Sequence, residues 1–164
     1  MQINKDINLL TKKEFLTIFG IIFEKSEWIA EETFNLRPFD NSDDLINKMI
    51  SIYENTSNEK IMYILNLHPK LAIEKNLTSY SSEEQKSAKL NSCTKEELEE
   101  FKNLNINYEK KFGFPFIIAV KGKNKNEILD NFRKRIKNSS QEEFNESKIQ
   151  VKKIALLRLN DVLK

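Results

Sequence analysis

Glycine and proline are scarce in this sequence, with three of each among 164 residues. Both residues interrupt helices, whereas Lys, Glu and Leu, which favour helices, are abundant between them. Helix start signals recur, because Ser or Thr precedes several amphipathic segments. We predict helices starting at Thr11, Ser26 and Ser42, a short one over Ile61–Leu65, and others near Ser81, from Thr94 to Tyr108, over Glu127–Ile136 and over Gln141–Leu163. The expected fold class is therefore all-α, a bundle of about eight helices.

The length and composition suit a single domain over residues 1–164. An apolar share of 39%, with 11 Phe, is enough for one hydrophobic core in a chain of this size. No apolar run approaches the roughly 20 residues that cross a bilayer, and Met1–Asn8 is polar, without the shape of a signal peptide. We therefore expect a cytoplasmic protein that does not enter membranes.

Several kinds of cofactor chemistry lack their usual residues here. One cysteine, Cys93, cannot form an internal disulfide, and with one histidine, His68, it cannot build a zinc site from these soft ligands. The three glycines lie too far apart for a GxGxxG or a Walker A loop. We expect neither a metal nor a cofactor.

One apolar segment departs from the helical pattern. Phe112–Gly122 carries a proline and β-branched residues between the two late glycines. A helix through Pro115 would cost about 3 kcal/mol, so we predict a buried extended passage between helices. Backbone N–H and C=O groups in such a passage need partners, and a polar ligand can supply them.

Two polar features near the middle of the chain allow a structural or a functional interpretation. His68 precedes Pro69, so it stands where a helix ends, and the helix dipole there favours a protonated imidazole able to donate a proton. An ordinary surface or capping histidine is the alternative. Ser81–Gln85 is typical of a capping box, with Ser81 as N-cap and Glu84 reaching back to it, but the same side chains can face a polar substrate.

Basic residues raise two further questions. Arg158 lies about 40° from the centre of the apolar stripe on its predicted helix, so it must extend to solvent, pair with a carboxylate such as Glu84, or bind an anionic ligand. Residues 101–164 carry 15 basic and 7 acidic side chains. The basic segment within them is either a solvated helix surface or a phosphate-binding face; it comprises Lys121, Lys123, Lys125, Arg133, Lys134, Arg135 and Lys137.

Short motifs follow one another along the chain in the order of a known enzyme family. They are Phe23-Glu24-x-Ser26-x-Trp28-Ile29-Ala30, Arg37-Pro38-Phe39, His68-Pro69-Lys70-Leu71-Ala72, Leu77-Thr78-x-x-Ser81-x-x-Glu84-Gln85, Leu104-Asn105-x-x-Tyr108-x-x-Lys111-Phe112-Gly113-Phe114-Pro115-Phe116-Ile117 and Lys153-Ile154-Ala155-x-x-Arg158-Leu159. Through them the sequence resembles 2-oxo-4-hydroxy-4-carboxy-5-ureidoimidazoline (OHCU) decarboxylase, the last enzyme of the route from urate to (S)-allantoin. The likeness covers essentially the whole chain.

The resemblance implies an all-helical, cofactor-free carboxy-lyase of purine degradation that acts on a small molecule and is often a homodimer. It implies His68 as the catalytic histidine, with Glu84 orienting it or sharing its proton. The matching substrate-binding positions are Pro69, Ser81, Gln85 and Arg158, together with backbone groups of Ile117, Ile118, Ala119, Val120 and Lys121.

Two departures from the family pattern leave an alternative open. Ile73 and Lys89 stand where the family usually has glycine. A relative with the same fold and a changed substrate is therefore one alternative, and a non-enzymatic helical module that binds nucleic acid or protein is another. We primarily expect the protein to act on a small-molecule substrate and to have no nucleic-acid partner.

Overall fold

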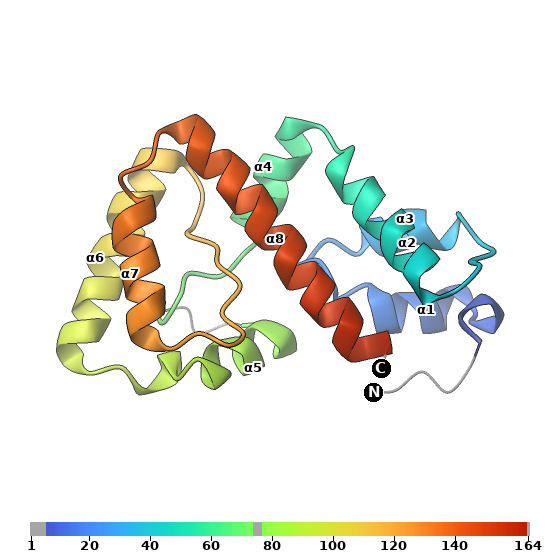
Figure 1. Ribbon diagram of the computed structural model, residues 1–164, viewed down its shortest axis with the longest axis horizontal. Helices are drawn as coiled ribbons and strands as arrows, with labels where there is room; N and C mark the ends of the chain where they lie inside the picture. The colour runs from blue at the N-terminus through green and yellow to red at the C-terminus, as the bar shows by residue number, and fades with distance from the viewer. Residues whose placement is uncertain (1–5, 74–76, 164) are drawn as a thin grey trace. The chain divides into compact units, whose positions relative to one another are not determined.

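The computed structural model describes residues 6–73 and 77–163, and within them every regular element is helical. Eight α-helices and two 3-10 helices follow one another in these described residues, which confirms the predicted all-α fold (Figure 1). Contacts divide the described chain into a first unit, up to Ile64 and again from Lys152, and a second unit, Leu65–Val151. The expectation of one domain stays a prediction. No helix of the described residues is long and apolar enough to cross a membrane.

The first unit is built on aromatic and aliphatic side chains from its early helices. Phe15 and Phe19 lie 4.5 Å apart between ring centroids, and Phe23 stacks on Tyr53 at 5.0 Å. The elements of this unit are η1 (Ile7–Leu9), α1 (Lys12–Phe19), α2 (Trp28–Phe34), α3 (Ser42–Glu54), most of α4 (Asn58–Asn66) and the last part of α8 (Ser140–Leu163).

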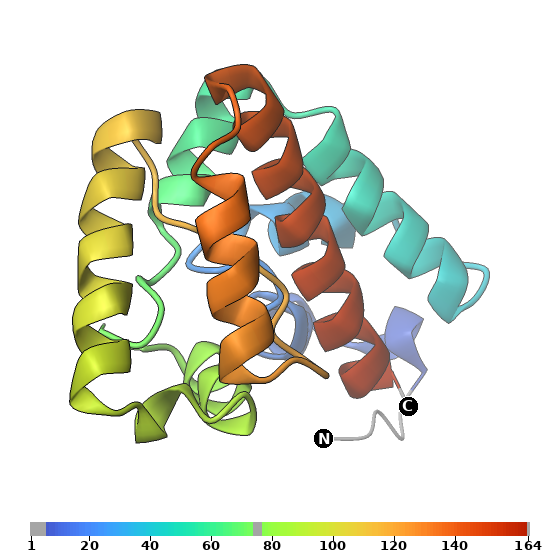
Figure 2. The ribbon, with the colours of Figure 1, turned by 60° about the vertical axis from the view of Figure 1, so that its left-hand side comes forward.

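The second unit has an aromatic core around Phe116. This ring stacks on Phe132 at 3.9 Å, and Tyr108 meets both rings edge-on. Helices α6 and α7 run side by side around this core (Figure 2). The elements are α5 (Ser79–Ser87), η2 (Leu90–Ser92), α6 (Lys95–Phe112), α7 (Lys125–Arg135) and the first part of α8.

The predicted passage between helices is present. Helix α6 ends at Phe112, and Gly113 caps it in the left-handed conformation at φ 79°, donating its N–H to the carbonyl of Glu109 over 2.8 Å. Residues 114–120 are buried and contain no helix, and the turn into α7 uses Gly122, also at φ 79°. The buried, non-helical passage is therefore confirmed over residues 114–120, whereas Phe112 still belongs to α6, and Gly113, Lys121 and Gly122 are exposed.

Helix starts show where the sequence signals were specific and where they misled. The capping boxes Thr11–Glu14 and Thr94–Glu97 are both formed. Helix α5 is instead capped by Thr78, whose hydroxyl accepts from the backbone N–H of Ser81, so the capping interpretation of Ser81 and Glu84 is wrong. Caps were also misplaced at two other helices: Asn41, not Ser42, caps α3, and α2 starts after Glu27 without a side-chain cap.

Candidate functional site

The candidate histidine stands where the sequence places it, just after a helix. Helix α4 ends at Asn66, and the backbone N–H of His68 still donates to the carbonyl of Leu65 over 3.2 Å. His68 is buried, and Pro69 follows it outside any helix. Proline cannot continue the hydrogen-bonding pattern, so the imidazole sits at a fixed helix-to-turn junction.

Two amide side chains hold the turn that follows His68. Asn105, in the buried face of α6, donates from Nδ2 to the carbonyl of Leu71 over 3.1 Å. Gln85 of α5 accepts the backbone N–H of Ala72 on Oε1 over 3.1 Å. Ala72 adopts φ 64°, which is unusual for a residue with a side chain, so these two hydrogen bonds help to offset the cost of a strained turn.

The accepted Ala72 N–H fixes the orientation of the Gln85 amide, and this leaves its nitrogen toward the interior. Gln85 is 7% exposed, and its Nε2 has no hydrogen-bond partner among the described residues. A buried amide that stays unpaired costs free energy, so native proteins rarely retain one without a function. A ligand oxygen is one partner that would satisfy it.

Helix α5 is unusual because both of its buried residues, Ser81 and Gln85, are polar. Glu84 lies one residue before Gln85 and is partly buried. Residues spaced by three or four share one helix face, so Ser81, Glu84 and Gln85 form a polar strip. A helix that turns polar side chains inward is typical of a binding site rather than of a hydrophobic core.

The passage residues that the resemblance assigns to ligand binding are fixed by side chains from two helices. Arg135 of α7 donates from Nη1 to the carbonyl of Ile117 over 2.7 Å. Gln150 of α8 accepts the N–H of Ala119 on Oε1 over 2.9 Å. The side chains of Ile117–Val120 are buried, whereas Lys121 is exposed. The sequence analysis names Arg135 only as part of the basic segment and does not name Gln150. Burial of an Arg and a Gln is uncommon and marks a polar function, but it becomes visible only in the structure.

Arg158 is buried in the first unit and forms an ion pair, one of its three predicted alternatives, with a carboxylate that the sequence analysis does not name. Its Nη1 and Nη2 both lie 3.3 Å from Oε2 of Glu24, and Nη1 is 3.2 Å from the carbonyl of Ile22. Arg158 and Glu24 are each 2% exposed. Sequence reasoning had named Glu84 as the internal carboxylate; a charged Glu24 directly after Ile21-Ile22-Phe23 was the signal that it overlooked.

The predicted site residues thus fall into two groups. His68, Pro69, Ser81, Glu84, Gln85 and Ile117–Lys121 all belong to the second unit, and Arg158 belongs to the first. Gln85 is linked directly to the turn after His68 by its hydrogen bond to Ala72.

Three of the seven residues of the basic segment are paired or buried. Lys125 pairs with Glu97 at 2.6 Å, Arg133 with Glu100 at 2.6 Å, and Arg135 is buried. Paired and buried cations are poor ligands for a phosphate backbone, so these three residues are poorly suited to a phosphate-binding face. Within residues 6–73 and 77–163, no group of three or more His, Cys, Asp or Glu could hold a metal ion.

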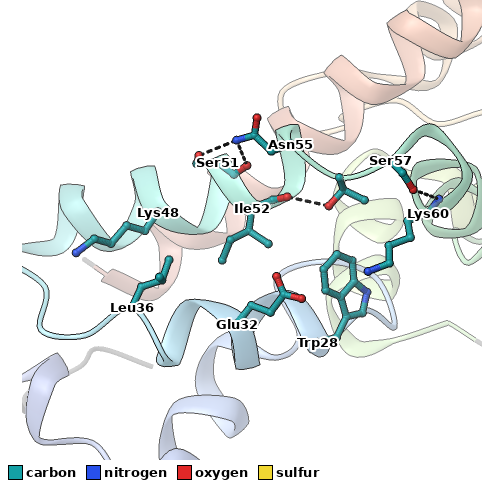
Figure 3. Close-up of a pocket in the computed structure, with 10 residues that line it drawn as sticks. Trp28, Glu32, Leu36, Lys48, Ser51, Ile52, Asn55, Ser57 and Lys60 are labelled. Atoms are coloured by element: carbon teal, nitrogen blue, oxygen red, sulfur yellow. Dashed lines mark hydrogen bonds between the residues drawn. The ribbon is translucent and has the colours of Figure 1, made fainter.

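The first unit contains a hollow that none of the predicted site residues lines. It measures about 500 Å³ and lies between α2, α3 and the start of α4 (Figure 3). Its lining residues are Trp28, Glu32, Leu36, Lys48, Ser51, Ile52, Asn55, Thr56, Ser57 and Lys60, with the Lys60 ammonium 4.8 Å from the Trp28 ring.

The protein is therefore all-α, with a candidate polar site where the turn after His68 is hydrogen-bonded to helix α5, whose buried residues are polar. The family described as OHCU decarboxylase matches residues 8–160. Among curated proteins, the chain is 37% identical over 155 residues to the 2-oxo-4-hydroxy-4-carboxy-5-ureidoimidazoline decarboxylase of Haloferax volcanii, covering 94% of this chain and 92% of that protein. The chain belongs to the OHCU decarboxylase family.

Two further similarities concern longer proteins. The chain is 39% identical over 160 residues to the uric acid degradation bifunctional protein of Bacillus sp. (strain TB-90), covering 98% of this chain but 32% of that protein. A crystal structure of (S)-allantoin synthase superposes with a TM-score of 0.77 at 28% identity, covering 94% of this chain and 51% of that one. The chain therefore spans about a third of the first relative and half of the second.

The two departures from the family pattern differ structurally. Lys89 adopts φ 59° and ψ 25°, the left-handed conformation that glycine enters at least cost, at the point where α5 gives way to η2. Ile73 is not among the described residues with positive φ; its neighbour Ala72 is. The glycine expected at position 89 therefore has a backbone reason, whereas no such reason applies at position 73.

Proposed function

We propose that this protein converts OHCU to (S)-allantoin and CO2 as a cofactor-independent carboxy-lyase in urate degradation. The observation that carries the proposal is the extent of the family match, because residues 8–160 include every proposed site residue. The buried Nε2 of Gln85 supports the proposal, since this donor needs a hydrogen-bond acceptor and none of the described residues provides one.

The reaction needs an acceptor for the electron pair of the breaking carbon–carbon bond. The substrate carboxylate leaves as CO2, and its bonding pair enters the conjugated system of the ring. The hydroxyl on the same carbon loses its proton and becomes the carbonyl of allantoin, while the neighbouring ring carbon gains a proton. The ring nitrogen that receives the electron pair takes up one further proton from solvent, so that charge and hydrogen both balance. Because the ring itself accepts the electrons, the protein has to bind, orient and transfer protons.

We assign these proton transfers to His68, at the substrate hydroxyl and the ring carbon, with Glu84 orienting the imidazole or sharing its proton. Pro69, Ser81, Gln85 and the backbone of Ile117–Lys121 would fix the ring so that one face is protonated. Arg158 would bind an anionic or carbonyl oxygen of the substrate. These roles follow from the resemblance; the buried polar strip of α5 supports those of Ser81 and Gln85.

The remaining parts of the proposal concern the surroundings of the enzyme. We propose a cytoplasmic protein with a small-molecule substrate and without a membrane or nucleic-acid partner, and a homodimer as its assembly. The ion pairs of Lys125 and Arg133 support the exclusion of nucleic acid, because they occupy two cations of the basic segment. Sedimentation velocity tests the dimer.

The test of activity uses freshly generated products of urate oxidation and separates the allantoin enantiomers. Spontaneous decay gives racemic allantoin, so an excess of the S form supports the proposal. Replacing His68 by Asn should abolish this excess while leaving the protein folded, because His68 follows α4 rather than lying within the helix. Racemic product from the folded wild-type protein would favour the relative with a changed substrate, and stereoselective turnover by His68→Asn would remove the histidine from its role.

A further inference from the structure

We propose that Gln150 and Arg135, the latter supported by Glu143, are positioning residues that hold the passage backbone as one wall of the candidate site. This inference rests on the proposed function and adds two residues that do not belong to the predicted site. Neither side chain is assigned a contact with substrate. Both act through the main chain of Ile117–Ala119.

The two anchors contact the passage in the pattern of a neighbouring β-strand. They bind the C=O of Ile117 and the N–H of Ala119, two residues further along. In an extended chain the polar groups of residues two apart point to the same side, and those of the residue between them point to the other. Two side chains therefore replace a partner strand along one edge of the passage.

The opposite edge is left for other hydrogen-bond partners. Ile118 is 4% exposed, and its backbone N–H and C=O form no hydrogen bond with another described residue. Buried backbone groups almost always have a partner, from protein, water or ligand. The anchored edge thus determines where the Ile118 donor and acceptor point, so that a planar ligand with its own donor and acceptor can pair with both.

The Arg135 anchor is rigid because its own partners are buried. Its Nε and Nη2 donate to Oε1 of Glu143 over 2.8 and 2.5 Å, and its guanidinium lies 4.4 Å from the Phe116 ring. Glu143, fully buried, also accepts from Asn138 Nδ2 over 2.9 Å and from the hydroxyl of Tyr108. Burial, with the neighbouring Glu143, raises the pKa of Tyr108, so this phenol stays protonated and donates.

The Gln150 anchor is oriented from its own helix. Its Nε2 donates to Oε1 of Glu146 one turn earlier in α8, over 2.7 Å, and this leaves Oε1 toward Ala119. Removing the acceptor while keeping the shape of the side chain is therefore the cleanest perturbation, and Gln150→Met does so. Gln141→Met is the matched control, because Gln141 lies exposed at the start of the same helix.

Swapping the glutamate at 146 and the glutamine at 150 should restore the anchor lost in Gln150→Met without changing the net charge. In the double variant Glu146→Gln with Gln150→Glu, the carboxylate at 150 can accept both the Ala119 N–H and the amide at 146. Net charge and the two hydrogen bonds are retained. A purely structural requirement for glutamine at position 150 would not predict recovery.

The experiment measures amide exchange at Ala119 by NMR together with KM and the enantiomeric excess of allantoin. We expect Gln150→Met to accelerate amide hydrogen exchange at Ala119 by about tenfold or more and to lower kcat/KM about tenfold, chiefly by raising KM. The double variant Glu146→Gln with Gln150→Glu should behave nearly as wild type. Arg135→Lys should raise KM as well. A lysine keeps a positive charge beside Glu143, but its single nitrogen cannot bind the Ile117 carbonyl at the same time, as the several nitrogens of a guanidinium do. Arg133→Lys on the exposed side of α7 is its control and should not.

Wild-type Ala119 exchange and KM in folded Gln150→Met would overturn the inference, as would failure of the swap to restore them. Racemic product from wild type would overturn the proposed function instead. In that case Ala119 exchange, which needs no turnover, still decides whether the anchors hold the passage, and binding of (S)-allantoin decides whether the passage is a ligand site. Should Gln150→Met not fold, the swapped variant and Arg135→Lys provide the same comparison.

Discussion

The chain buries two Arg–Glu pairs, one in each unit, and they are built differently. In the second unit, Glu143 receives two donors from Arg135, at 2.8 and 2.5 Å, and further donors from Asn138 and Tyr108. In the first unit, both nitrogens of Arg158 lie 3.3 Å from a single oxygen of Glu24. The Arg135–Glu143 pair is at short charge-assisted distances, whereas the Arg158–Glu24 pair lies beyond the usual 3.2 Å range of such bonds.

This difference separates two uses of a buried guanidinium. A short, fully hydrogen-bonded pair is specific in geometry, and Arg135 also donates to the backbone carbonyl of Ile117 and to the hydroxyl of Ser147. Such an arrangement fixes the fold around it. A longer pair binds its partner less firmly, so its geometry suits a guanidinium that also interacts with a bound anion, as proposed for Arg158. The variants below test this distinction, from the largest expected effect on stability to the smallest.

Replacing Arg135 by Met should be the most destabilising change. It leaves Glu143 buried without its cation, and breaking a buried pair in this way costs on the order of 3 to 5 kcal/mol. Urea unfolding monitored by circular dichroism measures the loss. Adding Glu143→Gln should recover part of it, because the remaining partner is then neutral; a double variant as unstable as the single one would contradict the assignment of the cost to an unpaired charge.

Replacing Arg158 by Met should destabilise less, by about 2 kcal/mol, because the broken contacts with Glu24 are longer. This loss is expected even if Arg158 also binds substrate, because the guanidinium is paired with Glu24 within the protein. At a temperature where the variant is folded, kcat/KM should fall by about 100-fold. Normal turnover in the folded variant would make Arg158 a structural residue.

Replacing Glu24 by Gln tests the carboxylate of the Arg158–Glu24 pair against that of the Arg135–Glu143 pair. An amide oxygen can still accept from Arg158, so the expected loss is about 1 kcal/mol, less than for Arg158→Met. The equivalent change at Glu143 should cost more, because four donors converge on that carboxylate. Equal losses at the two positions, measured by urea unfolding, would show that the longer distances of the Glu24 pair do not weaken it.

The sequence was informative about these elements to different degrees. Capping boxes are local, so Thr11–Glu14 and Thr94–Glu97 could be found without a structure, and Pro115 with its flanking glycines was enough to exclude a helix. At α5, Thr78 and Ser81 are both good N-caps three residues apart, and local spacing alone chose the wrong one.

The buried partners could not be found in this way, because they depend on contacts between distant segments. Glu24 and Arg158 are 134 positions apart, and Ala119 and Gln150 are 31 apart. A helical wheel identifies a polar residue in an apolar stripe but not what it meets. The resemblance to a family supplied the candidate site, and the structure added the residues that hold its backbone.

An exposed pair on α7 completes the series and should show the smallest effect. Arg133 forms two short hydrogen bonds with Glu100, 2.6 and 2.8 Å, but its side chain is 49% exposed. Its hydrogen bonds lower the pKa of Glu100, so the pair stabilises the fold above the ordinary pKa of a glutamate and loses this contribution as the pH falls through the lowered value. Solvent screening makes the loss in Arg133→Met the smallest of the series at neutral pH. Urea unfolding at low and high salt, at pH 7 and in acid, should show the difference between wild type and variant shrinking with salt and with acid. A difference as large as that of Arg135→Met would mean that burial does not distinguish these pairs.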